Sequence, residues 1–214
     1  VVWIRGILEE HYGVPHDSVT YCVGGQEQPG RREKSAIALP SRIRLERIGP
    51  DETLSNMLAR GAIDALYAPR EPSTLTSRPE DVRRLFPDHK AAEQDYYQRT
   101  GIFPIMHTLV IRREVYEQHR WVAQSLLKAW EAAKADLLRR LRDTSAPIAM
   151  LPWLVSHVDE ARRELGDDFW PYGLEPNRRA LETFLGYSHA QGLAPSRLTP
   201  EALFAPESLE AFRI

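Results

Sequence analysis

The chain has little of several features that mark particular classes of protein. A single cysteine, Cys22, among 214 residues excludes an intramolecular disulfide framework and thiolate zinc clusters, and it favours a reducing compartment. No apolar run approaches the roughly 20 residues that span a bilayer, so we expect no membrane insertion. A formal net charge of −2 gives no overall attraction to nucleic acid. We therefore expect small or proteinaceous partners, and a homo-oligomer stays open.

Catalytic motifs with fixed spacing are missing as well. The sequence contains no Gly-x-Ser-x-Gly elbow, no Walker loop and no Gly-x-Gly-x-x-Gly, so it gives no support to a serine hydrolase or a nucleotide-phosphate site. His89 with Glu93, and His157 with Asp159, place a histidine near a carboxylate, but neither pair forms a zinc-binding His-x-x-x-His or His-Glu-x-x-His arrangement. We expect neither a metal nor a cofactor.

The composition that is present, 43% hydrophobic and 27% charged, is typical of a soluble globular protein with one large domain or two small lobes. In the first third, helical and strand patterns alternate and are separated by glycine and proline. We expect helices at residues 1–13 and 51–60, and strands at residues 18–23, 42–48 and 63–68. This alternation predicts an α/β fold with crossover helices.

The second half is predicted to be mainly helical. Apolar residues at helical spacing predict helices at about 121–142, with Trp130 in the core, and at 154–165, with a last helix from about 175 to 192. Two loops are candidate ligand sites because loops aim polar side chains: residues 70–79, with Arg70, and residues 166–179, with Tyr172. A solvated loop, and simple packing of Tyr172, remain open alternatives.

Residues 102–111 form a largely apolar run with a histidine inside it, His107, between basic clusters at Arg99 and at Arg112. Pro104 makes a helix unfavourable, so a buried strand is the better prediction. A buried imidazole near guanidinium groups suggests chemistry on an anion, while a core histidine that has found a hydrogen-bond partner is the alternative.

Six segments together carry a resemblance that no single motif carries. They are VWIRGIL at 2–8, TGIFPIMHT at 100–108, WVAQSL at 121–126, WPYGLEPNR at 170–178, QGLAP at 191–195 and LFAPE at 203–207. In combination, and over essentially the whole chain, they resemble the 4,5-dihydroxyphthalate decarboxylase family.

The resemblance implies a type 2 periplasmic-binding-protein-like architecture, with two α/β lobes joined by crossing strands and the ligand between them. The present chain would lack the opening part of the first lobe, which would explain the abrupt start at Val1. Residues 1–100 would form the second lobe. Residues 101–214 would supply a crossing strand and the C-terminal helices that return to the first lobe.

The implied reaction is decarboxylation of 4,5-dihydroxyphthalate to protocatechuate and CO2 by protonation of the ring. Such a reaction needs a proton-transfer group and cations that hold the carboxylates. His107 is the predicted proton-transfer residue. The predicted substrate-binding residues, for which core packing of Trp3 is an open alternative, are Trp3, Arg5, Arg70, Arg99 and Tyr172.

A different class of function shares this fold. A non-catalytic solute-binding protein of an ABC uptake system would use the same cleft to hold a sulfonate, a carboxylate or a thiamin-precursor-like anion. We expect a cytoplasmic location for the enzyme, whereas a signal peptide on a missing N-terminus would place the protein in the periplasm. The fold alone does not separate the two.

Overall fold

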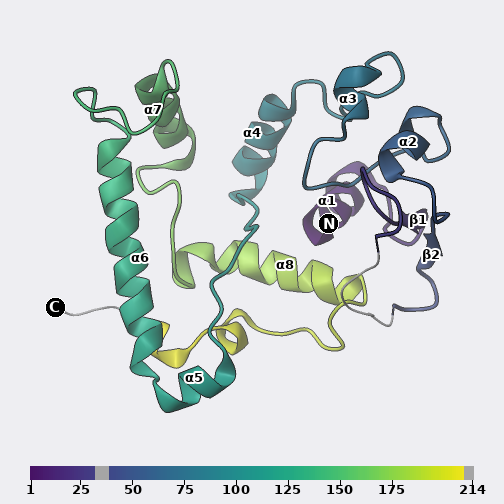
Figure 1. Cartoon of the computed structure of the whole chain (residues 1–214). Helices are drawn as coiled ribbons and strands as arrows, with labels where there is room; N and C mark the ends of the chain where they lie inside the picture. Colours follow the sequence, from purple (N-terminus) through teal and green to yellow (C-terminus); the bar gives the residue numbers. More distant parts are fainter. Residues whose placement is uncertain (32–38, 210–214) are drawn as a thin grey trace. The chain divides into compact units, whose positions relative to one another are not determined.

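The computed structural model describes residues 1–31 and 39–209 (Figure 1). The chain divides into two compact units. Unit 1 contains Val1–Gly101 and Thr183–Arg197, and unit 2 contains Ile102–Glu182 and Leu198–Ile214. Helices predominate, and the described residues form one small sheet of two strands. The predicted α/β class is confirmed at this coarse level.

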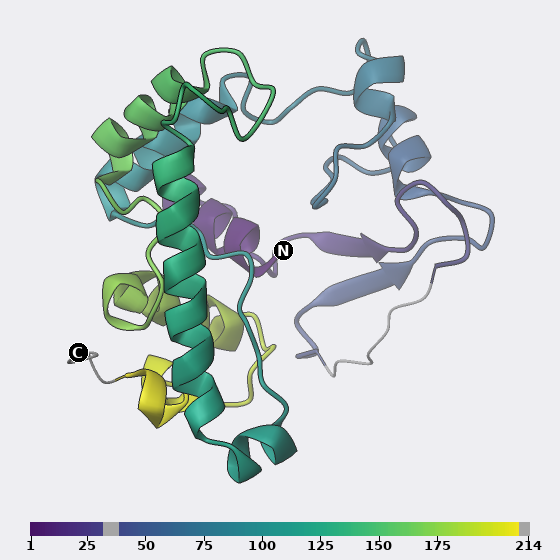
Figure 2. The same cartoon turned by 60° about the vertical axis from the view of Figure 1, so that its left-hand side comes forward.

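Unit 1 holds the sheet. Strands β1 (Thr20–Val23) and β2 (Arg44–Arg47) run parallel, with Thr20 opposite Arg44 (Figure 2). Both strands lie inside predicted ranges. The third predicted strand, at 63–68, is wrong: these residues form bends and irregular backbone. The run is short and interrupted by Asp64, and among the described residues no third strand joins β1 and β2 to stabilise it.

Helix α1 (Val2–Tyr12) confirms the first predicted helix. It buries Trp3, Gly6 and Leu8, and it ends at Gly13, whose φ of 66° lies in the left-handed region that glycine tolerates. Helix α2 (Leu54–Ala59) is also confirmed. Thr53 caps it by accepting a hydrogen bond from the Asn56 backbone N–H.

Two further helices of unit 1 were not predicted. The short helix α3 (Thr74–Ser77) lies within the expected loop at 70–79, and α4 (His89–Thr100) precedes the histidine segment. The sequence of α4 is mostly polar, so it shows almost no apolar stripe. Its caps carried the missed signal: the Asp88 carboxylate accepts from the Ala91 backbone N–H at 3.0 Å, and Gly101 adopts a left-handed conformation.

Helix α8 (Arg178–Ala190) confirms the last predicted helix and begins after a 3-10 turn, η1 (Glu175–Asn177). Within unit 1 its aromatic residues pack on α1: the ring of Trp3 lies 5.5 Å from that of Phe184 and 6.0 Å from that of Tyr187. A Cβ atom on Gly6 would lie 2.2 Å from the Tyr187 ring, so only glycine permits this approach.

Unit 2 is built from helices. The predicted helices at 121–142 and 154–165 are confirmed, while Trp130 is 49% exposed, so its predicted burial is wrong. Trp130 follows the apolar stripe of its helix, but no described element of unit 2 covers that side chain. The other elements of the unit are short. In chain order the elements are α5 (Arg113–Gln118), α6 (Trp121–Arg140), α7 (Leu154–Leu165), η1, η2 (Pro200–Leu203) and η3 (Pro206–Ser208).

The predicted buried strand at 102–111 is wrong. Ile102 is buried, but the backbone that follows is irregular, and Met106 and Val110 are 70% and 82% exposed. A strand needs hydrogen-bonding partners along its length, and no described segment pairs with this one as a strand. The apolar character of the run was read correctly; its burial was not.

No helix within residues 1–31 and 39–209 combines the length and the apolar character that crossing a bilayer requires.

Candidate functional site

Arg5 is the candidate site residue with the clearest unfilled binding capacity. Helix α1 holds its guanidinium over the ring of Tyr21 on β1, with Cζ 3.9 Å from the ring centroid. The Arg5 Nε is buried and has no hydrogen-bond partner among the described residues. No carboxylate of the described chain forms an ion pair with Arg5. A guanidinium held on an aromatic face, without a carboxylate partner in the described chain, is suited to a carboxylate ligand.

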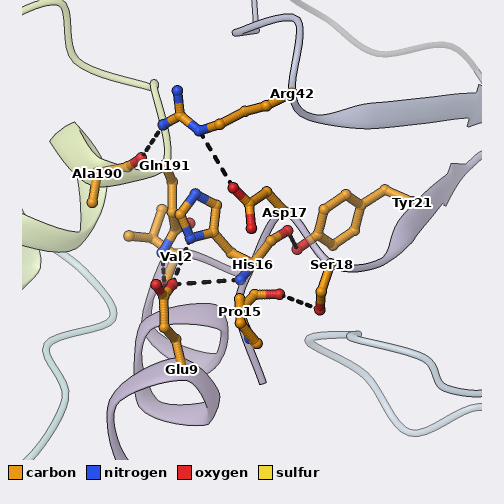
Figure 3. A network of polar contacts seen from close by, with 10 residues as sticks. All are labelled: Val2, Glu9, Pro15, His16, Asp17, Ser18, Tyr21, Arg42, Ala190 and Gln191. Atoms are coloured by element: carbon orange, nitrogen blue, oxygen red, sulfur yellow. Dashed lines mark hydrogen bonds and ion pairs between the residues drawn. The ribbon is translucent and has the colours of Figure 1, made fainter. Parts of the chain in front are cut away.

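A buried histidine, His16, contacts Tyr21, the residue whose ring lies against the Arg5 guanidinium. His16 is 8% exposed, and its Nδ1 lies 2.5 Å from Oε2 of Glu9 on α1 (Figure 3). The Tyr21 hydroxyl donates to the His16 carbonyl at 2.6 Å. Burial raises the pKa of Tyr21, which keeps this phenol protonated as a donor. Tyr21 therefore supports the Arg5 guanidinium with its ring and the His16 turn with its hydroxyl.

The end of α8 closes the same region of unit 1. The Arg42 Nη2 donates to the Ala190 carbonyl at 2.7 Å, and its Nε lies 3.7 Å from the Asp17 carboxylate (Figure 3). The Gln191 Nε2 donates to the Val2 carbonyl at 3.0 Å. These contacts hold the start of α1 and the turn before β1 against the last turn of α8.

A second polar cluster follows the carboxyl end of β1. The Glu27 carboxylate accepts from the hydroxyls of Ser55 and Ser73, each at 2.6 Å, and from the Ser73 backbone N–H at 3.1 Å. The hydrogen bonds from Ser55 and Ser73 lower the pKa of Glu27 to about 2. Ligands of open α/β sheets often lie at such strand ends. Here the carboxylate is already occupied by donors, so it joins the segment after β1 to helix α2 and to the start of α3.

The other predicted residues of unit 1 are differently employed. Trp3 is 6% exposed and packs on aromatic rings, as the core alternative expected. Arg99 is engaged, with Nε 2.8 Å from the Asp95 carboxylate and Nη1 3.2 Å from His11 Nδ1. Arg70 is exposed, and its carbonyl accepts from Gln26. Of the predicted arginines of unit 1, Arg5 and Arg70 have no carboxylate partner among the described residues, whereas Arg99 is paired with Asp95.

No described contact joins His107 to Tyr172, the two predicted site residues of unit 2. His107 is exposed in the irregular segment, so the expectation of burial is corrected, while its role in proton transfer stays a prediction. The Lys134 Nζ lies 4.7 Å from the centroid of the Tyr172 ring, and the same ammonium donates to the Asp168 carboxylate at 3.0 Å. Tyr172 thus has a packing role, and its substrate role stays a prediction.

His16 and Glu9 were missed by the sequence reasoning. They are seven residues apart, a spacing that matches no catalytic motif, and they meet because the chain reverses after Gly13. The one available signal was a histidine directly after Pro15, in a turn between a helix and a strand. Within the described ranges, no group of three or more His, Cys, Asp or Glu side chains is arranged to hold a metal ion.

The chain is similar in sequence to two known proteins. The chain is 43% identical over 213 residues to a 4,5-dihydroxyphthalate decarboxylase of Comamonas testosteroni. The aligned region covers 100% of this chain and 64% of that relative. It is 41% identical over 97 residues to a protein of the same name from Pseudomonas putida, covering 45% of this chain and 38% of the relative. No family model matches the sequence.

The fold and these similarities define an α/β protein related to aromatic-acid decarboxylases. Over its whole length the chain is similar in sequence to 4,5-dihydroxyphthalate decarboxylase. It spans 64% of the length of the Comamonas relative.

Proposed function

We propose that the protein to which this chain belongs removes one carboxylate from 4,5-dihydroxyphthalate and releases protocatechuate and CO2. The observation that carries this proposal is the 43% identity, over 213 residues, to a protein named for that activity. The structure adds a cation suited to an anionic substrate, the Arg5 guanidinium on the Tyr21 ring.

The chemistry explains why such a cation is useful. The leaving carboxylate is para to a phenol, so protonation of the ring carbon that carries it allows the para oxygen to release electron density. Loss of CO2 from the resulting quinoid intermediate restores the aromatic ring. A cation that holds the carboxylate which stays fixes the ring without stabilising the carboxylate that leaves. We assign Arg5 to that retained carboxylate.

The proton-transfer residue in this proposal is His107, which lies in a segment without secondary structure in unit 2. Arg70, Arg99 and Tyr172 remain lesser candidates for binding the second carboxylate or the catechol oxygens, and Trp3 remains a candidate face for the aromatic ring. Arg99 would have to exchange its contact with Asp95 for the substrate, which makes it a weaker ligand than Arg5.

We further propose the two-lobed, type 2 periplasmic-binding-protein-like architecture for the family, in a cytoplasmic protein. Two observations support the architecture. Residues 103–110 are largely apolar and largely exposed, and the chain spans 64% of the relative's length. In the proposed architecture, the remaining family length supplies strands that pair with residues 102–111 and cover them.

The proposal is tested by incubating a protein of the full family length with 4,5-dihydroxyphthalate and measuring protocatechuate and CO2. Arg5→Gln is expected to raise KM at least about tenfold, since a charge-assisted carboxylate contact is lost. His107→Ala is expected to lower kcat at least about 100-fold, as for a general acid–base group. Arg113→Gln, at a guanidinium that is 85% exposed, is the matched control and should leave both constants unchanged.

A result without turnover, combined with tight binding of another unreacted anion, would favour the solute-binding alternative instead. Near wild-type turnover of a folded His107→Ala variant would remove His107 from the mechanism. Circular dichroism on each variant separates loss of function from loss of fold.

A further inference from the structure

The surroundings of the Arg5 guanidinium limit how it can meet a ligand. The Tyr21 ring lies against it, with the Arg5 Cζ 3.9 Å from the ring centroid. The Arg5 Nε is buried, so a ligand does not reach that nitrogen. The terminal nitrogens, Nη1 and Nη2, are not buried, and they have no hydrogen-bond partner among the described residues. A ligand therefore meets the edge of the guanidinium that carries Nη1 and Nη2.

Tyr21 is itself held in place by the rest of unit 1. The residue belongs to β1 and is 8% exposed, and its hydroxyl donates to the His16 carbonyl at 2.6 Å. The His16 Nδ1 lies 2.5 Å from the carboxylate of Glu9 on α1, the helix that also carries Arg5 (Figure 3). Contacts therefore run from α1 through His16 to Tyr21, and from the Tyr21 ring back to α1 at Arg5.

An aromatic ring holds a cation in a different way from a carboxylate. The electron-rich ring face attracts the guanidinium without accepting any of its N–H groups. A carboxylate partner orders the side chain too, but it occupies the donors that a substrate would need, as Asp95 does for Arg99. Arginine loses much rotamer freedom when it is ordered. A ring that orders Arg5 beforehand removes that cost from substrate binding and leaves the donors free.

We propose that Tyr21 is a positioning residue, which holds Arg5 so that Nη1 and Nη2 each donate to one oxygen of the retained carboxylate. This inference rests on the proposed function, in which Arg5 binds that carboxylate. It adds the direction of approach and a residue that acts only through Arg5. Two parallel N–H···O bonds fix the orientation of a carboxylate as well as its position. Loss of the Tyr21 ring face should therefore raise KM and leave kcat nearly unchanged.

Fluorination of the ring at position 21 tests the proposal with little change in packing. Fluorine withdraws electron density from the ring face and weakens its attraction for a cation. In a protein of the relatives' full length, Tyr21 is replaced by phenylalanine and by pentafluorophenylalanine. Tyr21→Phe should raise KM by less than about threefold, because the ring face is kept. Pentafluorophenylalanine should raise KM about three- to tenfold above that of Tyr21→Phe, with kcat unchanged.

Two further variants show that the effect passes through Arg5. In an Arg5→Gln background, the fluorinated ring should have no additional effect on KM, since no guanidinium lies against it. Arg5→Lys keeps the charge but offers no pair of parallel donors, and it should raise KM at least about threefold. Tyr12 is the matched control, because its ring lies 5.2 Å from that of Phe86. The same two replacements at position 12 should leave KM and kcat unchanged.

A binding measurement separates this inference from the proposed reaction. Phthalate has the two carboxylates but lacks the hydroxyl groups that the reaction needs, and isothermal titration calorimetry gives its Kd in each variant. Absence of protocatechuate, with phthalate binding that weakens in the fluorinated variant, would overturn the proposed reaction and support this inference. Equal KM and equal phthalate Kd for Tyr21→Phe and the fluorinated variant would overturn the inference. So would a full fluorination effect in the Arg5→Gln background, a parent-like KM for Arg5→Lys, or a parent protein that binds neither substrate nor phthalate.

Discussion

The two units differ in how well their apolar residues are covered. In unit 1, Trp3 and Leu8 of α1, Tyr21 of β1 and Leu185 of α8 are buried, and few large apolar side chains are exposed. Unit 2 exposes many more of them. The exposed set in unit 2 includes Phe103, Met106, Leu109, Val110, Trp121, Trp130, Leu137, Met150, Leu151, Trp153 and Trp170. The comparison shows that an apolar sequence pattern predicts burial only where the segments that would cover it belong to the same unit.

The exposed side chains of unit 2 follow particular elements. They lie along residues 103–110, on α6, and in the connection from Met150 to Trp153 that precedes α7. Large exposed apolar patches mark surfaces that meet another chain segment or partner. Since the chain spans 64% of its relative's length, the remaining family length is the occupant that we propose for this surface.

The largest effect is expected from a matched pair of leucine-to-alanine substitutions, which tests whether the two units differ in the burial of their apolar residues. Leu8, which is 6% exposed in unit 1, and Leu109, which is 60% exposed in unit 2, are each changed to alanine. Leu8→Ala should lower the free energy of unfolding by about 2–5 kcal/mol, since it leaves a cavity in a packed core. Leu109→Ala should change it by less than about 0.5 kcal/mol.

Urea denaturation followed by circular dichroism measures both changes. Equal losses for the two variants would show that Leu109 is buried as well as Leu8, and would remove the difference between the units.

A smaller effect is expected at the Glu27 cluster of unit 1, and it depends on pH. The pKa of Glu27 is lowered from 4.5 to about 2 by Ser55 and Ser73, so its carboxylate stabilises the fold above pH 4.5. That contribution is lost as the pH falls from 4.5 toward 2. Glu27→Gln should be less stable than the parent at neutral pH, and the difference should shrink through this window.

Thermal unfolding at several pH values checks this expectation. Glu80→Gln, at an exposed carboxylate of the same unit, is the control that changes the same charge. A parent and a Glu27→Gln variant that stay equally far apart from pH 6 to pH 2 would contradict the assignment of the pKa shift to this cluster.

The same comparison explains which parts of the fold were predictable from sequence. Helices α1, α6 and α7 and strands β1 and β2 were predicted because their residue patterns, and the glycines that follow α1, β1 and α7, are local signals. Helix α4 was missed because it has little apolar patterning to detect. The segment at 102–111 was mispredicted because its burial depends on pairing with another segment, which no local pattern reports.

The candidate site divides in a similar way. Arg5 was predicted from its helix position and the resemblance, and its place on the Tyr21 ring, without a carboxylate partner in the described chain, supports that choice. His16 and Glu9 could not be found from spacing, because their contact depends on the turn at Gly13 that brings residue 16 back to α1. Gln191 is buried by a contact with Val2 across 189 positions, which sequence periodicity cannot report.

The smallest effect expected in this chain is that of Val110→Asp. Val110 is 82% exposed in unit 2, so a charge there meets water and should change the free energy of unfolding by less than about 0.5 kcal/mol. In a protein of the relatives' full length, the proposed covering of residues 102–111 would bury the same carboxylate, and the cost should rise above about 2 kcal/mol. Leu45→Asp, on a strand of unit 1 where the side chain is 47% exposed, is the control for a charge placed on an exposed apolar position. Urea denaturation of both lengths of protein gives the comparison. A Val110→Asp variant that is equally tolerated in both would show that Val110 faces solvent in the longer protein as it does in this chain, and the exposed surface of unit 2 would then need a partner from outside the polypeptide.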